Sequence, residues 1–117
     1  MNVGIVGSRR RQDQEKVELL VNELPEDTTI ISGGCEGVDR WAISAARERG
    51  MKTMEFYPYH PPPDSPKWEF TKAFHLRNQR IAENSDIIYA FVAHDRKGGT
   101  ENTIKHAEKL GVRVEIV

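Results

Sequence analysis

The sequence has little of what marks a secreted or membrane protein. Its only cysteine is Cys35, so no disulfide can form within the chain and a disulfide-stapled fold is excluded. No apolar run approaches the ~20 residues that a membrane crossing needs. The chain starts with a short apolar stretch followed by charge, which is the reverse of the order in a signal peptide. We therefore expect a cytoplasmic protein with no membrane partner.

Neither sign of charge is in excess. Lys and Arg number 17 and Asp and Glu number 18, which gives a net charge of -1. This balance counts against a nucleic-acid partner, because binders of polyanions usually carry a surplus of positive charge, but it leaves room for a local basic site. Hydrophobic residues are 38% and charged residues 30%, which is typical of a globular protein. A length of 117 residues predicts a single domain over 1–117.

The apolar periodicity alternates between that of strands and that of helices. Short, mostly β-branched runs predict strands at 2–6, 28–32, 52–56, 86–92 and 112–117. Helical spacing predicts helices at 13–24, 38–49, 67–84 and 100–110. Five of the six prolines lie in 57–66, which predicts a stiff loop. The pattern indicates a Rossmann-like, doubly wound α/β fold, with a mainly parallel sheet of about five strands and helices on both faces.

Six of the nine glycines follow a predicted strand and precede a predicted helix. In a doubly wound sheet these loops share the carboxyl edge, and ligands bind where the strand order reverses, here between the first and fourth strands. Glycine-rich loops at helix N-termini favour anions, so we predict a phosphate-bearing ligand; the alternative is that the glycines only form tight turns. The candidate ligand-binding residues are Gly7, Ser8, Arg9, Ser32, Gly33, Gly34, Gly37, Asp39, Asn78, Gly98, Gly99 and Thr100.

One arginine lies on an apolar helix face. Arg77 is seven residues after Phe70 and four before Ile81, so it needs an anionic partner or an exit to a cleft; the alternative is a structural ion pair. Arg10 and Arg11, beside the candidate loop, are interpreted as ordinary surface charges.

Other polar and aromatic residues leave alternatives open. Asp39 either caps a helix or contacts a ribose. Tyr57 and Tyr59 form either a lid that stacks on a base or part of a rigid crossover. The four histidines lack the spacing of metal ligands and there is no cysteine pair, so we predict no metal site and no cofactor.

Two segments carry a family resemblance. VGSRR at 6–10 and ISGGCEGVDRWA at 31–42 resemble the SLOG superfamily of Rossmann-like proteins, which includes the DprA/Smf DNA-processing proteins, the YpsA-like proteins and the LOG phosphoribohydrolases. His75-Leu76-Arg77-Asn78, Asp86 and Gly98-Gly99-Thr100 resemble the second half of the LOG motif. The resemblance covers nearly the whole chain except the proline-rich loop.

The LOG resemblance implies hydrolysis of the N-glycosidic bond of a nucleoside 5′-monophosphate. Arg77 falls on the catalytic arginine of that motif and would stabilise negative charge. Thr103 occupies the position of the family's glutamate, and Glu101 is the acid nearby, which makes it the candidate general base or ribose acceptor.

Three functions remain open at this point. The first is a protein that binds a nucleotide-like small molecule, with or without hydrolysis. The second is a non-catalytic module that senses a nucleotide, and the third is a DprA-like nucleic-acid binder. The resemblance also implies a homo-oligomer, a dimer or larger, and Trp68, Phe70 and Phe74 offer an apolar surface for it.

Overall fold

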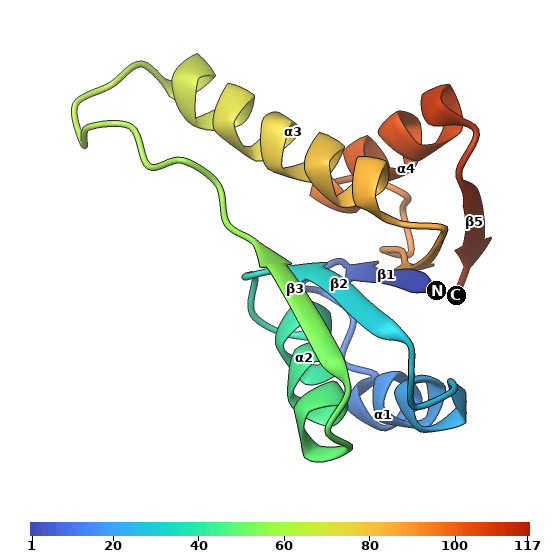
Figure 1. Ribbon diagram of the computed structural model, residues 1–117. Helices are drawn as coiled ribbons and strands as arrows, with labels where there is room; N and C mark the ends of the chain where they lie inside the picture. The colour runs from blue at the N-terminus through green and yellow to red at the C-terminus, as the bar shows by residue number, and fades with distance from the viewer.

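Strands and helices alternate strictly along the chain (Figure 1). The computed structural model describes residues 1–117. No helix combines the length and the apolar character that a membrane crossing requires. The elements are β1 (Asn2–Gly7), α1 (Gln14–Glu23), β2 (Thr29–Gly33), α2 (Val38–Glu48), β3 (Lys52–Phe56), α3 (Lys67–Asn84), β4 (Ile87–Phe91), α4 (Gly99–Leu110) and β5 (Arg113–Ile116).

The sheet is parallel throughout and its strand order is β3-β2-β1-β4-β5. The order reverses between β1 and β4, as the sequence predicts. Each predicted strand and helix is present, and β3 and α3 have the predicted bounds. α1 ends at Glu23, earlier than predicted, because Leu24 precedes Pro25 and is already extended, with ψ 148°. The predicted Rossmann-like α/β fold is confirmed.

The helices cover both faces of the sheet, with α1 and α2 on one side and α3 and α4 on the other (Figure 1). Successive strand residues point to opposite faces, so each strand supplies two cores. Ile5 and Ile30 pack in the core beneath α1 and α2. Their neighbours Val6 and Ile31 pack in the core beneath α3 and α4. Burial on both faces fixes the register, and this holds the carboxyl ends of the strands in place.

Candidate functional site

The loops after β1 and β2, the first turns of α2 and α4, and α3 line a pocket of about 210 Å³. It lies at the carboxyl edge, beside the reversal between β1 and β4. Eight of the residues that the sequence predicts for the site line it: Gly7, Ser8, Arg9, Asp39, Arg77, Asn78, Gly99 and Thr100.

The other predicted residues do not line this pocket. Ser32 is fully buried, and its hydroxyl donates to the carbonyl oxygen of Ile5 on the neighbouring strand. Gly37 and Gly98 have φ of +90° and +116° and come directly before α2 and α4, so both positions require a backbone conformation that favours glycine.

The two adjacent glycines, Gly33 and Gly34, allow close approach by side chains. A Cβ on Gly33 would lie 2.6 Å from Nη1 of Arg77 and 2.8 Å from Oδ2 of Asp39. A Cβ on Gly34 would lie 2.1 Å from the ring of Tyr57. These glycines therefore leave space for the side chains around the pocket.

Arg77 is a buried cation without an ion-pair partner. Its exposed fraction is 7%, and it forms no ion pair within 4.0 Å. Its Nε donates to Oδ1 of Asn78 at 2.9 Å, whereas Nη1 makes only a long contact of 3.5 Å to the Phe56 carbonyl oxygen and Nη2 donates to a weak acceptor, Sγ of Cys35, at 3.6 Å. The guanidinium thus faces the pocket with donor capacity to spare.

Asn78 positions Arg77. While its Oδ1 accepts from Arg77, its Nδ2 donates to Oδ1 of Asn102 at 3.2 Å and to the carbonyl oxygen of Gly99 at 3.4 Å. Asn78 therefore connects α3 to the first turn of α4. Since Gly99 and Thr100 line the pocket, the N-terminus of α4, with its partial positive charge, opens onto the same space as Arg77.

Asp39 is the acid that lines the pocket, and it is 5% exposed. Its Oδ2 accepts a hydrogen bond from the amide of Cys35 at 3.3 Å. Burial raises the pKa of Asp39 from 3.8 to about 6, although the positive charge of Arg77 and the bonds to the carboxylate oppose the rise. The charge of the pocket therefore changes at about pH 6.

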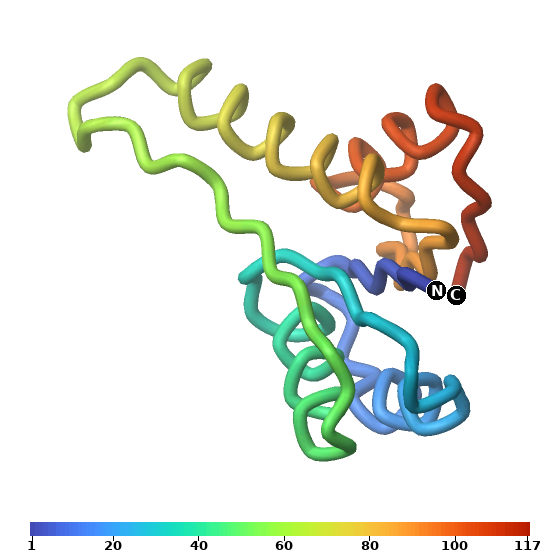
Figure 2. The backbone as a smooth tube through the Cα atoms, viewed as in Figure 1, coloured from blue at the N-terminus to red at the C-terminus, as the bar shows by residue number.

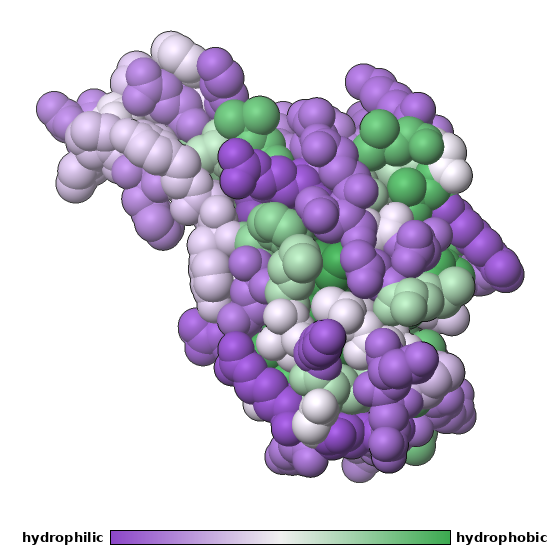
Figure 3. Space-filling model, in the orientation of Figure 1, coloured by the Kyte–Doolittle hydropathy of each residue, from purple (hydrophilic) through white to green (hydrophobic).

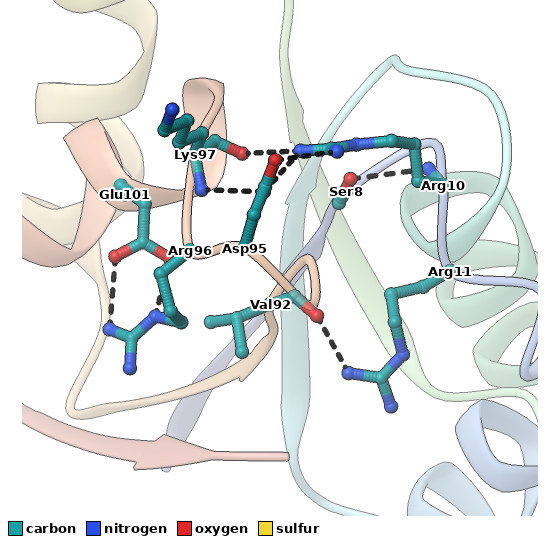
Figure 4. A network of polar contacts seen from close by, with 8 residues as sticks. All are labelled: Ser8, Arg10, Arg11, Val92, Asp95, Arg96, Lys97 and Glu101. Atoms are coloured by element: carbon teal, nitrogen blue, oxygen red, sulfur yellow. Dashed lines mark hydrogen bonds and ion pairs between the residues drawn. The ribbon is translucent and has the colours of Figure 1, made fainter.

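Most of the other charges beside the pocket are paired with one another (Figure 4). Arg10 donates to both carboxylate oxygens of Asp95, at 2.7 and 3.0 Å. Arg96 likewise donates to both oxygens of Glu101, at 2.8 and 2.9 Å. Glu101 does not line the pocket, so the predicted general base is held outside it by Arg96.

Arg11 differs from the surface charge that the sequence predicts. It is half-buried, and its Nη1 donates to the carbonyl oxygens of Val92 and Val117 at 2.9 and 2.6 Å. It therefore fastens the end of the chain to the end of β4. Of the three consecutive arginines, Arg9 alone lines the pocket, and it forms no ion pair within 4.0 Å.

Sequence reasoning missed three polar or aromatic lining residues. Cys35 lines the pocket beside Arg77, although the sequence offers no base partner that marks it as functional. Phe74 is one turn before Arg77, and its ring lies 5.8 Å from the guanidinium carbon, so helical spacing could have found it. Thr103 also lines the pocket, and its place in the LOG motif was the available signal. No group of three or more His, Cys, Asp or Glu side chains is arranged to hold a metal ion.

Comparison with known proteins is consistent with this geometry. The X-ray structure of DNA processing protein A (DprA) from Streptococcus pneumoniae is similar over 98% of this chain, with a TM-score of 0.81 and 22% identity. The similarity covers 49% of that chain, so the present chain spans about half its length. A comparison with curated proteins gives no match. The family model for DNA recombination-mediator protein A matches residues 1–61. The predicted SLOG resemblance is thus supported by fold and by sequence, and the chain belongs to the DNA recombination-mediator protein A family.

Proposed function

We propose that this chain binds a DNA strand and takes one of its phosphates into the pocket between Arg9 and Arg77. The observation that carries the proposal is Arg77, a buried guanidinium with no carboxylate within 4.0 Å that opens onto a pocket. Burying a cation is costly unless anions neutralise it, and the one acid of the pocket, Asp39, lies beyond 4.0 Å and is easily protonated because burial raises its pKa to about 6. A phosphate fits the planar fork of arginine and the N-terminus of α4 together.

The size of the pocket supports an extended ligand. At about 210 Å³ it is smaller than the roughly 300–1,000 Å³ of sites that enclose a whole small molecule. A phosphate and part of its sugar would fill it, and the rest of the ligand would lie outside. This agrees with a strand that passes over the pocket.

The near-neutral composition predicts that nucleic acid is not a partner. Membership in the DNA recombination-mediator protein A family does not support that expectation. Net charge is a sum over the surface. Here acids neutralise Arg10 and Arg96, whereas Arg9 and Arg77 have no ion-pair partner at the pocket. A strand held through few phosphates needs only such a local site.

The second candidate is a free nucleotide, bound without hydrolysis. The same arginines and helix N-terminus would hold its terminal phosphate, which keeps the nucleotide-sensing alternative open. Hydrolysis is less well supported, because Thr103 stands where the LOG motif has its glutamate and the carboxylate of Glu101 is bound by Arg96.

The proposal is tested by the anisotropy of a fluorescent oligothymidylate at several salt concentrations. We expect the logarithm of the binding constant to fall linearly with the logarithm of the salt concentration. The slope should be about −1.4 for two phosphate contacts, and steeper by about 0.7 for each further phosphate that a cation contacts. Unlabelled thymidine monophosphate should compete weakly. Absence of salt-dependent binding would contradict the proposal, and competition as strong as that of the oligonucleotide would favour the free nucleotide.

A further inference from the structure

A long arm projects from the body of the molecule between β3 and α3. It consists of residues 57–76, which are the proline-rich loop and the first half of α3 (Figure 2). The arm accounts for much of the elongated shape, 42 × 26 × 25 Å. Its surface in Figure 3 is largely pale, intermediate in hydropathy, with more strongly polar groups between.

The arm gathers exposed aromatic side chains. Half of the ten exposed large hydrophobic residues of the chain lie on it. Tyr57, Tyr59 and Trp68 are 62%, 66% and 62% exposed. Scattered surface hydrophobics need no explanation, but a concentration of this kind on one segment indicates a binding surface.

The arm is ordered enough to present these rings. Pro61 is buried although it lies in the projecting loop, and the amide of Ser65 donates to the carbonyl oxygen of Pro62 at 2.9 Å. Proline also fixes the backbone φ at several positions. The backbone of the arm therefore has little freedom to lose when a ligand contacts the rings.

Two hollows lie between the tip of the arm and the phosphate pocket. The outer one, about 280 Å³, is lined by Tyr59, Trp68 and Lys72, among others. The inner one, about 260 Å³, is lined by Tyr57, Tyr59, Arg77 and Arg80, among others. Arg77 also lines the phosphate pocket, and Tyr59 lines both hollows, so the pocket and the two hollows lie one after another along α3; we call this row the path.

The charge along this path is positive. Lys72, Arg77 and Arg80 line the two hollows, against a single acid, Glu69. The whole chain, in contrast, has one more acid than base. Aromatic rings interleaved with cations are the chemistry that recognises unpaired nucleic-acid strands, because every base has a face that can stack and every linkage has a phosphate.

We propose that the arm is a base-stacking subsite, on which bases adjoining the phosphate at Arg77 stack against Tyr57, Tyr59 and Trp68. The inference rests on the proposed function and adds where the strand runs: from the pocket outward along α3, with its unpaired bases on the rings of the arm. Because stacking tolerates any base, the subsite confers little sequence preference.

The fluorescence of Trp68 gives a direct readout. Trp41 is half-buried against the core, so Trp41→Phe leaves Trp68 as the only tryptophan with little disturbance. Oligothymidylate should quench Trp68 in this variant, and an abasic oligonucleotide with the same number of phosphates should not. Equal quenching by the two oligonucleotides, or no quenching by either of them, would overturn the proposal.

Affinity gives the second readout. We expect Tyr59→Ala and Trp68→Ala each to weaken oligothymidylate binding by about 5-fold or more and to leave abasic binding unchanged, with Trp68→Phe retaining most of the affinity. The matched control is Leu19→Ala, which removes a 61% exposed side chain from α1 without effect on either ligand.

Failure of this inference can be told from failure of the proposed function. If oligothymidylate binds and Arg77→Met weakens it, but the arm variants bind as well as the natural sequence, the stacking subsite is wrong and the phosphate pocket stands. If the arm variants instead change the sedimentation of the free protein and not its affinity, the arm contacts a second copy and the proposal is overturned. If the unmodified protein binds no oligonucleotide, both fail.

Discussion

Arg77→Met is expected to weaken oligonucleotide binding by about 30-fold or more while the protein stays folded. Loss of one partner from a buried, charged hydrogen-bonded contact usually changes binding by at least about 2 kcal/mol. Methionine replaces the apolar stem of arginine as far as the Nε position, but it lacks the guanidinium that lies beside Phe74 and Cys35 and donates no hydrogen bond. Anisotropy titrations of both proteins measure the loss.

Stability must be followed in parallel, because a folding defect would also reduce binding. Arg77 forms no close ion pair, but methionine leaves the buried Oδ1 of Asn78 without its donor, so we expect the free energy of unfolding in urea to fall by about 1–3 kcal/mol. The matched control is Arg113→Met on β5, which removes an exposed arginine far along the sheet from the pocket. Equal binding losses in the two variants would mean that only overall charge matters.

Asp39→Asn is expected to stabilise the protein above neutral pH. The pKa of this carboxyl is about 6 in the folded protein and 3.8 ordinarily, so the folded state binds its proton more readily than the unfolded state does. The ionised form is therefore unfavourable in the folded protein. The difference corresponds to about 3 kcal/mol as an upper figure.

The stability difference between the two proteins should depend on pH. Well below pH 3.8 the carboxyl is protonated in both states, so the asparagine variant should gain nothing there and only little at pH 4. As pH rises from 4 through 6, the natural protein loses the contribution of Asp39, and above pH 7 the variant should be more stable by on the order of 1–3 kcal/mol. Urea denaturation of both proteins at pH 4 and pH 8 measures it, and a variant less stable at pH 8 would contradict the burial argument.

The same titration should appear in ligand binding. An ionised Asp39 repels a phosphate held beside Arg77, so oligonucleotide affinity should rise as pH falls from 8 to 5.5. This rise should be absent in Asp39→Asn. Stability and affinity therefore report on one carboxyl by independent routes.

The fold follows from the sequence because local signals agree with one another. Strand-length apolar runs, helical spacing and glycine at the helix ends all favour the same alternation, and Gly50 and Gly111 do adopt left-handed φ of +71° and +73° after α2 and α4. The order reversal followed from the handedness of the crossovers. Arg77 was identified by its place on an apolar helix face.

The details of the site depend on distances that sequence does not contain. Ser32 looked like a ligand residue, but the β1–β2 register directs its hydroxyl to a backbone carbonyl. Arg11 looked like a surface charge, but the end of the chain passes beside it. Net charge predicts little affinity for nucleic acid. A sum over the chain does not show that Arg10 forms an ion pair within 4.0 Å and that Arg77 does not.

The most direct test of the phosphate pocket is an amide NMR titration of the protein with a short oligothymidylate. If a strand phosphate enters the pocket, the backbone signals of Gly7, Ser8, Gly99 and Thr100 and the side-chain Nε signal of Arg77 should shift together and saturate at one affinity. If oligonucleotide binds but these signals stay unchanged while others shift, the strand lies elsewhere and the assignment of this pocket is wrong.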